Sequence, residues 1–185
     1  MKRTFIAVKI PVSRTTAEII QDIKSELQDE KIKWVETFNM HITLFFAGET
    51  HDEMIKKISS EMEYLLKNEK PFTLKGEGIG LFKNLNNPRV LWLGIEESEY
   101  LQHVKKEIDQ MMGNFGFAIE DRKFKPHLTL GRMKQINNKA KLKNVLEHYK
   151  EVKFQDFFID NVIYYESRLT SSGPIYKVIK QIALT

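Results

Sequence analysis

The pattern His-x-Thr-Leu occurs twice in this chain of 185 residues, as HITL at 41–44 and as HLTL at 127–130. The sequence holds only five histidines, and two of them stand in this same frame, one in each half. Side chains alternate between the two faces of a β-strand. On a strand, each motif therefore places its histidine and threonine on one face and its apolar residues on the other. We expect the apolar face to anchor in a core and the polar face to line a cleft.

Strand-like and helix-like segments alternate along the rest of the chain. The order strand, helix, H-x-T-L strand, helix occurs in each half, which is compatible with an internal duplication. This alternation indicates an α/β or α+β sheet protein. Short turns are expected between the elements, among them SSGP at 171–174. Apolar spacing and a capping Ser13 predict helices that begin after 13 and cover about 51–68, 98–112 and 138–149, and the longest strand-like run is 152–169.

Composition narrows the classes of function. There is no cysteine, which excludes disulfides and thiolate chemistry and fits a reducing compartment. Lys9 and Pro11 interrupt the first apolar run, so we interpret it as a strand and not as a signal peptide. No apolar stretch approaches the length of a membrane span, so a cytoplasmic protein is expected. The net charge of +4 favours an anionic partner, with a lysine-rich solvated surface as the alternative.

Two histidine–threonine pairs in one cleft suit the hydrolysis of a cyclic phosphodiester. That reaction takes a proton from the attacking water and gives one to the leaving oxygen, and histidine can do either near neutral pH. Threonine hydroxyls can donate to the non-bridging phosphate oxygens. Such a site needs neither a metal nor a cofactor. A metal site is the weaker hypothesis, since no H-E-x-x-H or carboxylate cluster accompanies the two histidines. Two core histidines with satisfied hydrogen bonds are the structural alternative.

Segments beyond the two motifs resemble the two-histidine phosphoesterases, and within them the RNA 2′,3′-cyclic phosphodiesterases, also called the 2′-5′ RNA ligase family. The resemblance runs through nearly the whole chain. It rests on RTFIAVKIP, KWVETFNMHITLFFAGE, RVLWLGI, FKPHLTLGR and YYESRLTSSGPIYKVI. It implies an α+β fold with two pseudo-symmetric lobes in a single domain over 1–185. Antiparallel sheets would line a central cleft, and the helices would lie outside.

The resemblance also implies an activity and a set of residues. The activity is hydrolysis of a terminal 2′,3′-cyclic phosphate on RNA to a 2′-phosphate, without metal or cofactor. His41 resembles the proton donor to the leaving 3′-oxygen, and His127 resembles the proton acceptor from water, although a pseudo-symmetric site leaves the reverse assignment open. Thr43 and Thr129 would bind the phosphate. The expected partner is RNA with cyclic phosphate ends, tRNA fragments among the candidates, and one cleft per chain suggests a monomer.

Two further residues are candidates for substrate binding. Arg132 matches a basic position of the family, but strand alternation puts it opposite His127 unless a bulge at Gly131 or the strand end intervenes. It is a candidate contact to phosphate or RNA, with a solvent-exposed arginine as the alternative. Phe45 shares the face of His41 by alternation and is a candidate to line a base pocket, but core packing is the favoured interpretation. The basic run DRKFKP at 121–126 could follow an RNA backbone or be a solvated loop.

Two other functions stay open at this level. The same cleft could join or cleave 2′-5′ linked RNA, or the protein could bind RNA ends without turnover. The paired acid and base argue against simple binding, because binding alone does not require them.

Overall fold

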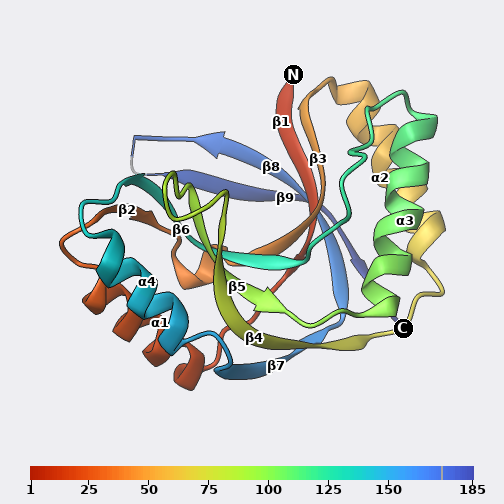
Figure 1. Ribbon diagram of the computed structural model, residues 1–185. Helices are drawn as coiled ribbons and strands as arrows, with labels where there is room; N and C mark the ends of the chain where they lie inside the picture. The colour runs from red at the N-terminus through yellow and green to blue at the C-terminus, as the bar shows by residue number, and fades with distance from the viewer. Residues whose placement is uncertain (172) are drawn as a thin grey trace.

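The computed structural model describes residues 1–171 and 173–185 and has an α+β fold, as predicted. Helices lie outside two antiparallel sheets (Figure 1). The helices are α1 (Arg14–Glu26), α2 (Asp52–Leu66), α3 (Glu99–Asn114) and α4 (Lys139–His148), with a 3₁₀ turn η1 (Thr37–Asn39). The strands are β1 (Lys2–Lys9), β2 (Lys31–Trp34), β3 (His41–Thr50), β4 (Phe72–Phe82), β5 (Val90–Ile95), β6 (His127–Gln135), β7 (Lys153–Ile159), β8 (Asn161–Leu169) and β9 (Pro174–Ala183).

The two motif strands belong to different sheets. The first sheet has the order β3-β1-β8-β9, and the second has the order β2-β6-β5-β4-β7. In each sheet a motif strand pairs with the strand that precedes it in the repeated order, β3 with β1 and β6 with β5. The predicted repetition of strand, helix, motif strand and helix is confirmed by β1-α1-β3-α2 and β5-α3-β6-α4.

The sheets draw their strands from both halves of the sequence. The C-terminal hairpin β8–β9 joins β1, and β2 crosses to pair with β6. The expectation of one long strand over 152–169 is wrong, because the chain divides at Asp160 into β7 in the second sheet and β8 in the first. The expected turn at 171–174 includes residue 172, which lies outside the described residues.

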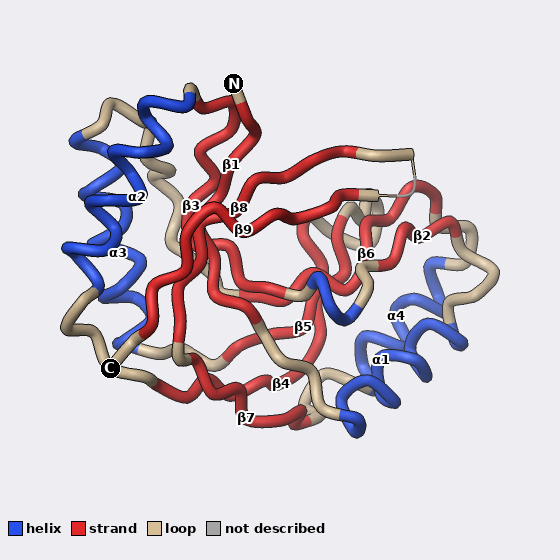
Figure 2. Tube along the Cα trace, turned by 180° about the vertical axis from the view of Figure 1, so that it is seen from behind, coloured by secondary structure: helices blue, strands red, loops and turns tan. Residues whose placement is uncertain are grey.

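The four predicted helices are confirmed, and their first turns show why they begin where they do. The hydroxyl of Ser13 accepts a hydrogen bond from the Thr16 backbone N–H at 3.2 Å, as expected for an N-cap. Ser98 caps α3 in the same way through the N–H of Leu101. Helices α2 and α3 lie side by side at one end of the molecule, and α1 and α4 lie together at the other (Figures 1 and 2). In the described part of the chain, no helix is long and apolar enough to span a membrane.

Most buried apolar side chains form one continuous core, but a second cluster lies on the opposite face of the first sheet. This smaller cluster contains Phe5, Ala7, Ile163 and Tyr165, with Tyr176 packed against it. Cross-strand partners share a face of a sheet, and Ala7 is the partner of the motif residue Thr43. The smaller cluster therefore supports the face of the sheet that carries the first motif.

Candidate active site

The two motif histidines have the same local environment. Each is the first residue of its strand, His41 in β3 and His127 in β6. The Nδ1 atom of His41 lies 2.7 Å from the carbonyl oxygen of Asn39, and that of His127 lies 2.9 Å from the carbonyl oxygen of Lys125. A carbonyl oxygen can only accept, so Nδ1 carries the proton in both rings. In the neutral state, Nε2 of each ring is left free to take up a proton.

Aromatic rings hold each imidazole from the side. Tyr176 meets the His41 ring edge-on, with centroids 5.1 Å apart and an interplanar angle of 87°, and Phe5 lies 4.9 Å away. Phe82 meets the His127 ring in the same manner at 4.5 Å and 86°. Edge-on pairs are a favoured geometry for aromatic rings. Together with the carbonyl bonds, these contacts limit the rotation of both imidazoles.

Electrostatics show that the fold brings the two motifs together. Burial lowers the pKa of His41 below the ordinary value of 6.5, and the carbonyl of Asn39 opposes this effect only in part. The charges of His127 and Arg132 lower the pKa of His41 further. Burial is also the main cause of the lowered pKa of His127, and Arg132 and Lys125 add to it. Both histidines and Arg132 therefore lie within electrostatic reach of one another, although they come from different sheets.

A cavity of about 110 Å³ lies between the two motifs. Thr43 of β3 and Thr129 of β6 both line it, together with His41 and Arg132. Strands of both sheets thus contribute hydroxyl groups and a guanidinium group to one small cavity. The rest of its wall is formed by Lys33, Trp34, Val35, Asn39, Met40, Pro174 and Tyr176. Of the two histidines and two threonines of the motifs, His127 is the one that does not line this wall, but it is close enough for its charge to lower the pKa of His41.

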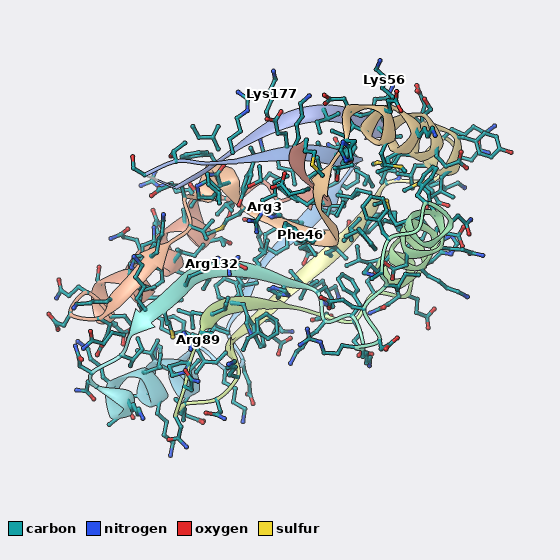
Figure 3. The ribbon with its side chains drawn as sticks, turned by 90° about the horizontal axis from the view of Figure 1, so that it is seen from above. Arg3, Phe46, Lys56, Arg89, Arg132 and Lys177 are labelled. Atoms are coloured by element: carbon teal, nitrogen blue, oxygen red, sulfur yellow. The ribbon has the colours of Figure 1, made fainter. Side chains whose placement is uncertain are left out.

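A bulge brings Arg132 to the cavity. Thr129 pairs with Trp92 of β5, but Gly131 pairs with Leu91, so Leu130 has no partner on β5. This extra residue reverses the alternation after Thr129, and Arg132 therefore shares the face of the motif. Gly131 is needed at this point, because a Cβ atom there would lie 2.6 Å from Cγ2 of Ile32. Figure 3 shows Arg132 on the side of β6 that faces the first sheet.

A matching bulge in the first motif places Phe45 in the core, which agrees with the packing role and rules out Phe45 as a substrate-binding residue. Phe45 pairs with Ile6 of the main core and is only 7% exposed, so it packs inside and does not line the cleft. Leu44 is the extra residue, and Phe46 takes the cleft-facing position as the partner of Phe5. Phe46 is 53% exposed, and the guanidinium of Arg3 lies 4.9 Å from the centre of its ring (Figure 3).

Sequence reasoning missed Phe46, although one signal was available. Phe46 stands at the same offset from His41 as Arg132 does from His127. Aligning the two motifs beyond their fourth residue would have placed these two side chains in equivalent positions. The alternation of side chains along β3 alone could not place Phe46, because the bulge is visible only in the pairing of β3 with β1.

The other candidate residues are placed outside the centre of the site. The histidines beyond the two motifs are exposed, and they are His51, His103 and His148. Phe124 packs against the core, while most of the basic run around it is exposed. Trp34 is half-buried, and it packs against the main core as well as lining the cavity wall. Among residues 1–171 and 173–185, no group of three or more His, Cys, Asp or Glu side chains is arranged to hold a metal ion.

A family model described as "LigT like Phosphoesterase" matches this chain twice, over residues 8–92 and 93–176. Each match contains one H-x-T-L motif. The two matches together span most of the chain, and their boundary falls within β5, the first strand of the second repeated set. The double match supports the internal duplication that the order of elements indicates.

Curated relatives match over nearly full length. A Methanocaldococcus jannaschii protein named RNA 2′,3′-cyclic phosphodiesterase is 40% identical over 179 residues, which cover 97% of this chain and 99% of the relative. A Thermotoga maritima protein of the same name is 34% identical, with 96% of this chain and 92% of the relative covered.

Solved structures share the fold. TT0787 of Thermus thermophilus superposes with a TM-score of 0.80 at 22% identity, covering 98% of this chain and 97% of that one. E. coli LigT, solved in complex with 3′-AMP, superposes with a TM-score of 0.75 at 24% identity, covering 100% and 98%.

Proposed function

Since the chain belongs to the LigT-like phosphoesterase family, we propose that it hydrolyses the 2′,3′-cyclic phosphate at RNA 3′ ends to a 2′-phosphate. The observation that carries the proposal is the meeting of the two H-x-T motifs at one small cavity with a guanidinium group in its wall. The names of the M. jannaschii and T. maritima relatives support the same substrate class.

The two imidazoles supply the proton transfers. We assign His127 as the base that takes a proton from the attacking water through its free Nε2. His41 is the acid that protonates the 3′-oxygen as its bond to phosphorus breaks, which leaves the phosphate on the 2′-oxygen. The lowered pKa of His41 makes the neutral imidazole its resting form. An anionic phosphate in the adjacent cavity would favour the protonated ring and so prepare the acid.

Hydrogen-bond donors in the cavity bind the phosphate. Thr43 and Thr129 each offer a hydroxyl, and Arg132 offers a charged fork that matches phosphate oxygens. When water attacks the phosphorus atom, the negative charge carried by the non-bridging phosphate oxygens changes. Donors that are already in place can stabilise that charge without reorganisation. This set replaces the expected set, in which Phe45 stood with Arg132 and the two threonines.

Phe46 and Arg3 are the candidates for contact with the nucleobase. Their cation–π pair lies along β3 beyond Thr43, on the face that carries the motif. An exposed aromatic ring beside a cation is a suitable surface for stacking a base without strict sequence preference. This end of the site therefore favours RNA as the substrate class over a small cyclic phosphate that has no nucleobase.

The proposal extends to the organisation of the chain, its oligomeric state and its location. We propose that residues 1–185 work as a single two-lobed unit, because each sheet combines strands from both halves of the sequence. One chain supplies both motifs, which supports action as a monomer. Cytoplasmic location and tRNA fragments as natural substrates are also part of the proposal, and RNA processing is the biological role that they imply.

Turnover of an oligoribonucleotide with a 2′,3′-cyclic phosphate end tests this function. Wild-type protein should convert it to the 2′-phosphate, and His41→Ala and His127→Ala should each lose a factor of about 10² to 10⁴ in rate. His148→Ala, an exposed histidine outside the site, is the matched control. Undiminished turnover in both motif variants would refute the mechanism. Binding without any turnover in wild type would favour an end-binding protein, and joining of cleaved RNA halves would favour the ligase.

A further inference from the structure

A larger cavity adjoins the phosphate cavity, and the two share part of their walls. Its volume is about 610 Å³, which is within the range of small-molecule binding sites. It shares His41, Lys33 and Tyr176 with the smaller cavity but includes neither motif threonine. It therefore extends from the His41 end of the site, while Phe46 lies along β3 on the other side of Thr43.

The wall of this larger cavity combines an exposed aromatic ring with cations. Phe38 of η1 is 70% exposed and is the most exposed apolar side chain in the wall. Lys9 and Lys33 are exposed, and neither forms an ion pair with any residue that the structure describes. Glu36 is the single carboxylate in the wall. Cations that track a backbone, together with an aromatic ring that stacks a base, are what single-stranded nucleic acid requires.

The stereochemistry of ribose decides which part of an RNA end points toward this cavity. The 3′-oxygen is attached next to C4′, which carries C5′ and the phosphodiester to the preceding nucleotide. The 2′-oxygen is attached next to C1′, which carries the base. With the 3′-oxygen held toward His41, the preceding nucleotide leaves on the His41 side. The base of the terminal nucleotide leaves on the opposite side, toward Phe46.

We infer that the 610 Å³ cavity binds the nucleotide immediately upstream of the one that carries the cyclic phosphate. Lys33 borders both cavities and is placed to contact the phosphodiester that joins the two nucleotides. Lys9, the β1 partner of His41, adds positive charge to the wall beside that histidine, and Phe38 offers a stacking surface to the upstream base. The inference rests on the proposed function, and in particular on His41 facing the 3′-oxygen. It makes the enzyme selective for RNA ends over mononucleotides.

The test compares a dinucleotide that ends in a 2′,3′-cyclic phosphate with the corresponding cyclic mononucleotide. Because one stacked base and one phosphodiester contact are gained, kcat/KM should be at least about tenfold higher for the dinucleotide. Phe38→Ala should bring this ratio close to one, and Lys9→Gln should lower it by a smaller factor. Phe158→Ala, an exposed phenylalanine on β7, and Lys57→Gln on α2 are the matched controls, which should leave the ratio unchanged.

The outcomes separate this inference from the proposed function. Turnover of both substrates with a ratio within twofold of one would overturn the upstream site alone. So would a high ratio that survives Phe38→Ala, because another surface would then read the upstream nucleotide. Failure of wild-type protein to act on either substrate would overturn the proposed function and the upstream site with it. Phe38 is largely exposed, so its replacement should leave the thermal unfolding midpoint unchanged, which a melting curve checks.

Discussion

Replacing Arg132 with glutamine is expected to slow catalysis and to move its pH dependence, and the two effects have one cause. Arg132 lies in the wall of the phosphate cavity, and its charge lowers the pKa of both motif histidines. Glutamine keeps a polar side chain at this position and removes the charge. A hydrogen bond to a charged group contributes about 1.5 to 3 kcal/mol. Since each 1.36 kcal/mol or so is a factor of ten in rate, kcat/KM should fall by about 10- to 100-fold.

The pH dependence gives a second readout that simple loss of binding would not produce. A positive charge disfavours the protonated form of a nearby imidazole, so its removal raises the pKa of His41 and of His127. The bell-shaped profile of kcat/KM for the Arg132→Gln protein should therefore lie at higher pH than that of wild type. The assay is hydrolysis of a cyclic mononucleotide from pH 4.5 to 9 at constant ionic strength.

Arg14→Gln is the control for this experiment, because Arg14 is exposed on α1, forms an ion pair with Glu18 and is not part of the cavity wall. It should change neither the rate nor the profile. A rate for Arg132→Gln within twofold of wild type would show that the guanidinium does not contact the phosphate. A reduced rate with an unmoved profile would mean that Arg132 positions substrate without acting on the histidines, which contradicts the electrostatic reasoning.

Three further predictions concern acid–base chemistry, metals and stability. Because burial lowers the pKa of His41 and His127, the bell-shaped pH profile of kcat/KM should have its maximum below pH 6.5 and fall from there to pH 8. A rate that rises steadily from pH 5 to 9 would contradict this expectation. EDTA should leave turnover within twofold, as a chelator titration would show. Glu30→Ala should lower the free energy of unfolding by about 2 kcal/mol. The buried Glu30 carboxylate accepts hydrogen bonds from the backbone N–H groups of Asn137 and Asn138 at 2.6 and 2.9 Å, and alanine would leave both donors without this partner. An unchanged midpoint of denaturant unfolding would argue against this prediction.

Local patterns in the sequence were sufficient for the helices and for the motif faces. The cap at Ser13 and the apolar spacing that follows it depend on neighbours within a few turns of one helix. The alternation within His-x-Thr spans three residues of one strand, and in both motifs each of the three has a partner on the neighbouring strand. His41 and Thr43 therefore lie on one face, as do His127 and Thr129, and both threonines line one cavity.

The pairing between distant strands decided the rest. The positions of Phe45, Phe46 and Arg132 follow from bulges at Leu44 and Leu130, and a bulge is defined by two strands together. The division of 152–169 at Asp160 likewise depends on which sheet accepts each part. The sequence by itself determined which residue types carry the chemistry and which of them share a strand face. Only the tertiary structure decided that the two motifs meet, which aromatic ring faces the cleft and that a second cavity adjoins His41, because each of these depends on register and packing between segments far apart in the chain.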